Sequence, residues 1–86
     1  MQSVTVEGHY HGRNLHVQNS FNAAQARFCT TEIVVNGEVT NDPFDSSLYE
    51  IDLKARNLRP GDAVTVRIYH MDECGIRVLN PEVLAP

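Results

Sequence analysis

Hydrophobic and polar residues alternate along most of this chain, and the alternation is clearest in residues 48–53 and 63–72. Side chains of a strand point alternately to the two faces of a sheet, so a period of two predicts strands with one buried face. Pro60-Gly61-Asp62 lies between the two segments and favours a type II turn, because proline presets φ and glycine accepts a positive φ. The residues predicted to face the core are Tyr49, Ile51, Leu53, Val64, Val66 and Ile68, with His70 at the rim, while Thr65, Arg67 and Tyr69 face outward.

The same period predicts strands elsewhere in the chain. Asn36-Gly37 is typical of a type I′ hairpin turn, which needs a positive φ at both central positions. Residues 19–27 are expected to form a loop with one helical turn, and residues 82–84 a short tail that can add at a sheet edge. The other predicted strands are Ser3–Glu7, Asn14–Gln18, Phe28–Val35, Glu38–Thr40 and Ile76–Leu79, with His9–His11 as a short strand end or a loop.

About seven short strands without a crossover helix predict an all-β fold. We expect an immunoglobulin-like or fibronectin-like antiparallel β-sandwich, with a small closed barrel as the alternative. The chain has 86 residues, which predicts a single domain over residues 1–86. A chain of this length buries only about 60–65% of its unfolded surface, so its core is thin.

The composition of the chain argues against several classes of partner. The chain is 42% hydrophobic, and its seven basic residues are scattered among eleven acidic ones, for a net charge of −4. A nucleic-acid partner normally requires a clustered basic face, so none is expected. No segment approaches the roughly 20 apolar residues of a membrane span. Residues 1–10 predict a strand and not an export signal, which leaves a cytoplasmic protein or a mature or excised domain.

The two cysteines, Cys29 and Cys74, are candidates for a disulfide. An even count in a small domain with a thin core favours pairing, which would constrain the unfolded chain by about 4 kcal/mol. Two reduced cysteines are the alternative. Two thiols alone do not supply the four ligands of a structural zinc site.

Histidines are the other candidates for chemistry. His9 and His11 are two residues apart and would share one face of a strand, so with a third ligand such as His70 they could hold Zn²⁺ or Cu²⁺. Exposed histidines beside turns, with one rim histidine, are the plainer interpretation. A nucleophilic Cys74 activated by His70 requires a turn at 71–73, since residues four apart on a strand lie about 13 Å apart. No other catalytic arrangement is recognisable, and no cofactor is predicted.

Leu58-Arg59-Pro60-Gly61-Asp62, leading into Val64-Thr65-Val66, resembles the turn before a late strand of immunoglobulin-like and fibronectin-like sandwiches. A wider set of segments resembles a small immunoglobulin-like β-sandwich domain of exported bacterial proteins. This resemblance implies a periplasmic, outer-surface or extracellular location, strengthens the case for the disulfide and carries no catalytic residue. Asn19-Ser20-Phe21 departs from the Asn-Pro-Phe expected there. The segments are Asn14–Asn19, Phe28-Cys29, Val35–Gly37, Tyr49–Leu53, Asp72–Cys74 and Val78–Leu84.

These observations predict a non-enzymatic accessory or interaction module of an exported protein. It would present one sheet face to a protein or cell-surface partner, with Arg67 and Tyr69 as the contact residues, because an outward tyrosine beside an arginine is typical of interface anchors. A transition-metal-binding domain using the histidines is the alternative function. A small hydrolase or redox protein using Cys74 is a third.

Overall fold

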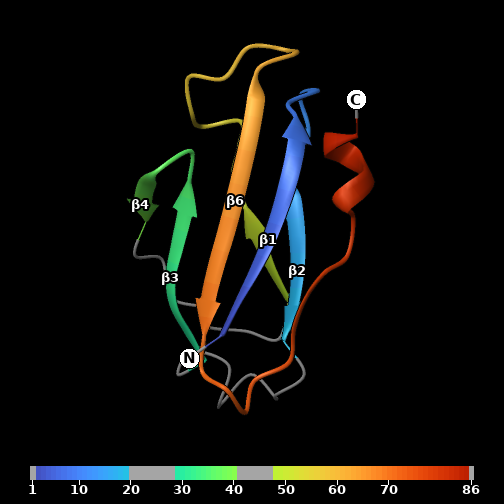
Figure 1. Cartoon of the computed structure of the whole chain (residues 1–86). Helices are drawn as coiled ribbons and strands as arrows, with labels where there is room; N and C mark the ends of the chain where they lie inside the picture. The colour runs from blue at the N-terminus through green and yellow to red at the C-terminus, as the bar shows by residue number, and fades with distance from the viewer. Residues whose placement is uncertain (1, 20–28, 41–47, 86) are drawn as a thin grey trace.

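Two antiparallel sheets face each other in the computed structural model, which describes residues 2–19, 29–40 and 48–85 (Figure 1). One sheet has the strand order β1-β6-β3-β4 and the other the order β5-β2-β7. The predicted antiparallel β-sandwich of about seven strands is therefore confirmed. The elements are β1 (Gln2–His9), β2 (Leu15–Asn19), β3 (Thr30–Val35), β4 (Glu38–Thr40), β5 (Leu48–Ile51), β6 (Ala63–His70), β7 (Ile76–Val78) and the 3₁₀ helix η1 (Pro81–Leu84).

Strand β6 is the central element of the four-stranded sheet. It pairs with β1 over the full register from Gln2↔His70 to His9↔Ala63, and with β3 on its other side. Its inward residues Val64, Val66 and Ile68 are at most 1% exposed, and His70 at its end is 4% exposed. The residues of β6 that the sequence predicts to face the core are therefore the buried residues of the folded strand. His70 lies at the end of the strand, as predicted.

Most of the core comes from the inward faces of the two sheets, but three contributions come from outside the strands. Tyr10, directly after β1, is buried, as are Leu53, two residues after β5, and Val83 and Leu84 of η1. The predicted edge tail is therefore wrong: these residues form a 3₁₀ turn that inserts two apolar side chains between the sheets. Pro81 starts this turn, and the amide of Val83 donates to the Asn80 carbonyl at 3.2 Å.

Both predicted turns are present. Asn36 and Gly37 have φ values of 50° and 82°, as a type I′ turn requires. In the second turn Gly61 has a φ of 93°, and the Asp62 amide donates to the Arg59 carbonyl at 2.9 Å. The Asp62 carboxylate accepts the Arg59 amide at 2.8 Å, so the aspartate closes the turn from both ends.

Two asparagine side chains bond backbone groups at the end of the three-stranded sheet where β2 begins. The Asn14 carboxamide oxygen accepts the amides of Leu53 and Lys54 at 2.8 and 2.9 Å. The Asn80 carboxamide accepts the His16 amide at 2.7 Å and donates to the Asn14 carbonyl at 3.1 Å. These bonds satisfy backbone groups that have no partner in the strand ladders, and those of Asn80 tie the segment before η1 to the start of β2.

The inner strands pair as in an immunoglobulin domain, in which the second strand pairs with the fifth and the third with the sixth. The first and last strands are exchanged. In an immunoglobulin domain the first strand joins the second and the last joins the sixth, whereas here β1 pairs with β6 and β7 pairs with β2. Residues 10–14 carry the chain from one sheet to the other.

The predicted loop at 19–27 lies outside the described residues except for Asn19, which is the last residue of β2, and residue 28 of the predicted third strand and residues 41–47 lie outside them as well. No helix in the described part of the chain is long and apolar enough to cross a membrane.

Replacing Gly8 with alanine should lower the free energy of unfolding by about 1–3 kcal/mol, the usual cost of overpacking. A Cβ at Gly8 would collide with the carbonyl oxygen of Leu84, so η1 would have to move. Urea unfolding measures the loss, and amide chemical shifts report whether Val83 and Leu84 are displaced. Gly12→Ala is the control for the displacement of η1. Its φ of 88° strains an alanine and also costs stability, but nothing lies within 4 Å of the added carbon, so η1 should keep its position. An undisturbed η1 in Gly8→Ala would contradict the contact.

Candidate functional site

The outer face of the four-stranded sheet carries the residues predicted to contact a partner. The strand registers place Thr5, Arg67, Val34 and Val39 in one row across β1, β6, β3 and β4. Tyr69 lies in the next row, opposite Ser3 and Glu32. We call the outward side chains of these two rows the β6 face.

Arg67 is held in the middle of the β6 face by its neighbours. Its Nε donates to the Thr5 hydroxyl at 3.3 Å, and its Nη1 donates to the Tyr69 hydroxyl at 3.4 Å. The hydrogen bond to Tyr69, with a smaller contribution from the negative charge of Glu7, raises the pKa of the Arg67 guanidinium above its ordinary value. The structure therefore brings the predicted pair together as an exposed, oriented cation beside an aromatic ring.

Apolar surface borders this cation. Val39, in the same row, is 48% exposed, and Val34 lies between it and Arg67. A central arginine and tyrosine beside one exposed and one partly buried valine have the composition of an interface core, in which aromatic residues and arginine are enriched.

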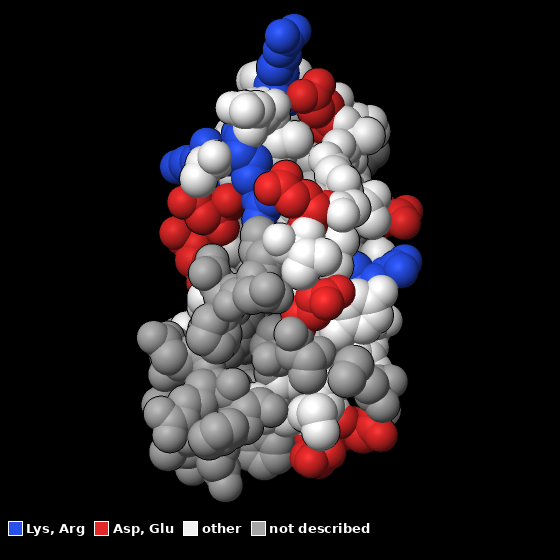
Figure 2. All heavy atoms as spheres, turned by 90° about the vertical axis from the view of Figure 1, so that its left-hand side faces the viewer, with Lys and Arg blue, Asp and Glu red and all other residues white. Residues whose placement is uncertain are grey.

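A second feature, a cleft of about 580 Å³, lies where β3 and β4 of one sheet approach β5 of the other. We call it the seam cleft. Ile33, Val35 and Ile51 form its apolar floor, and Asp52 with residues 55–58 forms one wall. Figure 2 shows this side of the molecule, where acidic and basic side chains lie close together in the upper half. The other lining residues are Asn36, Glu38, Tyr49 and Glu50.

Arg56 is the basic residue of the seam cleft. Its side chain is 19% exposed, and its Nη1 lies 3.8 Å from the carboxylate of Glu38, which is 79% exposed. The Nε of Arg56 is buried and has no hydrogen-bond partner among the described residues. The sequence does not single out this residue, because Arg56 is one of seven scattered basic residues and lies outside any predicted strand.

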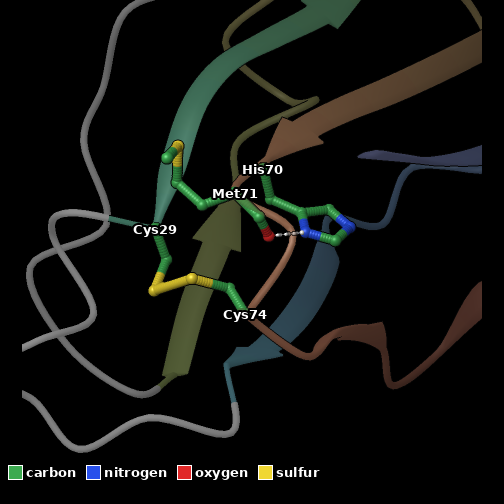
Figure 3. Close-up of a disulfide and its surroundings, with 4 residues drawn as sticks. All are labelled: Cys29, His70, Met71 and Cys74. Atoms are coloured by element: carbon green, nitrogen blue, oxygen red, sulfur yellow. Dashed lines mark hydrogen bonds between the residues drawn. A yellow bond between two sulfur atoms is a disulfide. The ribbon is translucent and has the colours of Figure 1, made fainter. Parts of the chain in front are cut away.

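The two cysteines form a disulfide, with their Cα atoms 5.7 Å apart. It joins the start of β3 to the loop after β6 (Figure 3). The intervening backbone is ordered around Met71, whose amide donates to the Cys29 carbonyl at 2.9 Å and whose carbonyl accepts the Cys74 amide at 3.1 Å. The predicted pairing is confirmed, and it is compatible with an oxidising compartment.

The disulfide removes the free thiol that a nucleophilic Cys74 would need. His70 does not complete such a site either. Its Nδ1 donates to the Met71 carbonyl at 2.8 Å, and its ring points away from the disulfide (Figure 3). His70 is therefore a rim histidine whose polar atom is satisfied by backbone.

The candidate metal-binding histidines are not brought together. His9 pairs with Ala63 at the start of β6, whereas His70 ends the same strand, about 23 Å away at 3.3 Å per residue. His11 lies beyond the end of β1, and its Nε2 donates to the Ala85 carbonyl at 2.6 Å. Within residues 2–19, 29–40 and 48–85, no group of three or more His, Cys, Asp or Glu is placed to hold a metal ion.

Comparison with known protein families, with curated proteins and with solved structures finds no match to this chain.

Replacing both cysteines with serine should lower the free energy of unfolding by about 4 kcal/mol, because the disulfide closes a loop of 45 residues in the unfolded chain. Chemical denaturation of the double variant beside the wild type measures the loss. Reduction of the wild type should give the same destabilisation, whereas a reducing agent should leave the double variant unchanged. A denaturation midpoint independent of reducing agent in the wild type would contradict this.

Proposed function

We propose that this domain is a non-enzymatic interaction module that binds a protein partner through the β6 face, outside the cytoplasm. The observation that carries the proposal is the fixed pair of Arg67 and Tyr69 at the centre of the broader sheet. The guanidinium is oriented by two side-chain hydroxyls before any partner arrives. Preorganised side chains lose less conformational freedom on binding, so more of their contact energy appears as affinity.

The surroundings of the pair support a protein partner. Val34 and Val39 extend the face with apolar area beside the cation. An acidic or tyrosine-rich surface patch would match the guanidinium, and an apolar rim would cover the valines. The disulfide supports a periplasmic or extracellular setting, since such bonds persist in oxidising compartments.

The test compares two double variants that remove matched pairs from opposite faces of the sandwich. Arg67→Ala with Tyr69→Ala removes the proposed contact. Arg77→Ala with Gln18→Ala removes an equivalent exposed pair, in which Nη2 of Arg77 donates to the Gln18 carboxamide at 2.9 Å on the other sheet. Proteins retained from the extracellular fraction by the wild type are identified, purified and titrated against each variant by calorimetry.

Loss of two anchor side chains should weaken binding of the purified partner by about 30-fold or more, the effect of at least 2 kcal/mol typical of hot-spot residues. The control variant should bind like the wild type. Equal weakening in both variants would indicate a general loss of stability. Undiminished binding by the Arg67/Tyr69 variant would overturn the proposal.

A further inference from the structure

We propose that Asn36 is a site of spontaneous deamidation and that the fold controls this modification through the two hydrogen bonds of the Asn36 carboxamide. Asn36 and Gly37 form the turn between β3 and β4, with φ values of 50° and 82°. Glycine has no Cβ to shield its amide nitrogen, so the Gly37 nitrogen can attack the side chain of the asparagine before it. Asn36 is exposed to water, and no described atom beyond the chain neighbours lies within 4 Å of a Cβ placed at Gly37. Packing around the turn therefore does not block the reaction.

The reaction consumes a water molecule and releases ammonia. The Gly37 amide nitrogen gives its proton to solvent and bonds to Cγ of Asn36. The bond from Cγ to Nδ2 then breaks, and Nδ2 takes a proton from solvent and leaves as ammonia. Water opens the resulting cyclic imide at either of its carbonyl carbons, which leaves aspartate or isoaspartate at position 36. The isoaspartate form has an extra carbon in its backbone, so it no longer matches the geometry of a two-residue hairpin turn.

In the folded chain the carboxamide of Asn36 is bonded to the backbone of β6. Its Oδ1 accepts the Thr65 amide at 2.8 Å, and its Nδ2, the atom that leaves in the reaction, donates to the Ala63 carbonyl at 3.2 Å. The Asn36 amide adds a further bond, to the Thr65 carbonyl at 2.9 Å. Cyclisation has to turn the carboxamide toward Gly37 and break the bond to Ala63. The folded protein therefore reacts during local openings that release the turn from β6.

The modified chain cannot restore these bonds. After hydrolysis an oxygen takes the place of Nδ2, and a carboxylate oxygen accepts hydrogen bonds but cannot donate one to the Ala63 carbonyl. A hydrogen bond between the turn and the start of β6 is replaced by repulsion between two acceptors. The modified turn consequently opens more readily than the original one. Deamidation at Asn36 is thus slow while the fold is intact, and it permanently marks a chain that has opened.

The first experiment incubates the disulfide-bonded protein at mildly alkaline pH, either folded in buffer or unfolded in guanidinium chloride. Mass spectrometry of the peptide that contains Asn36 then measures aspartate and isoaspartate. The folded protein should react at least about tenfold more slowly, because two hydrogen bonds must open first. Asn57 is the internal control, since it is exposed but precedes Leu58, whose side chain shields its own amide. In guanidinium chloride Asn57 should react more slowly than Asn36, and Gly37→Ala should slow the reaction at Asn36.

The second experiment measures the effect of the modification on the fold. Asn36→Asp reproduces one product, and chemical denaturation should show that it raises the population of unfolded chain by about fivefold or more. Its amide resonances should shift at Ala63 and Thr65, which contact the carboxamide in the wild type. Asn57→Asp makes the same change of charge at an exposed asparagine, and it should unfold like the wild type.

Three results would overturn the proposal: equal rates of modification at Asn36 in the folded and the unfolded protein, a reaction at Asn57 as fast as that at Asn36 in the unfolded chain, or an Asn36→Asp variant as stable as the wild type. None of them depends on whether the β6 face binds a protein.

Discussion

Backbone hydrogen bonds on both sides of β6 fix the position of every other part of the four-stranded sheet. β6 is paired with β1 along its whole length and with β3 along most of it. Because the inward valines and isoleucine of β6 are almost completely buried, the side chains that alternate with them point to the opposite face of the sheet. The β6 face is thus a direct consequence of burying the alternate residues of one strand.

A shift of one residue along β6 would exchange the two faces, burying Arg67 and exposing Ile68. The structure opposes such a shift at both ends of the strand. At the start, the Asn36 carboxamide accepts the Thr65 amide at 2.8 Å and donates to the Ala63 carbonyl at 3.2 Å. At the far end, Met71 is bonded to Cys29, and the disulfide follows three residues later. The Cys29–Cys74 disulfide therefore preserves the strand register of β6 and also constrains the unfolded chain.

The sequence was sufficient for those features that depend on neighbouring residues alone. Alternation gave the inward and outward sets of β6, and Asn36-Gly37 and Pro60-Gly61 gave the turns, because a period of two and a requirement for positive φ are local properties. It was insufficient where distant segments meet. The burial of Tyr10 and Leu84, the bonds between Asn14 and Asn80, and the seam cleft around Arg56 all depend on how the two sheets are placed. A charged residue near a turn has the same local pattern whether it faces water or a cleft.

Arg67 and Arg56 differ in solvation, and this difference determines what each side chain can do. Arg67 is exposed, so a partner must displace water from its guanidinium, and its contribution depends on an extended, complementary surface that excludes solvent around it. Arg56 is 19% exposed, and its Nε has already lost its water on folding. A buried Nε is closed to a ligand oxygen of the size of water, so the contribution of Arg56 is to the packing of the sheet edges beside Glu38. The proposed recognition at the β6 face, in contrast, requires the area of a protein.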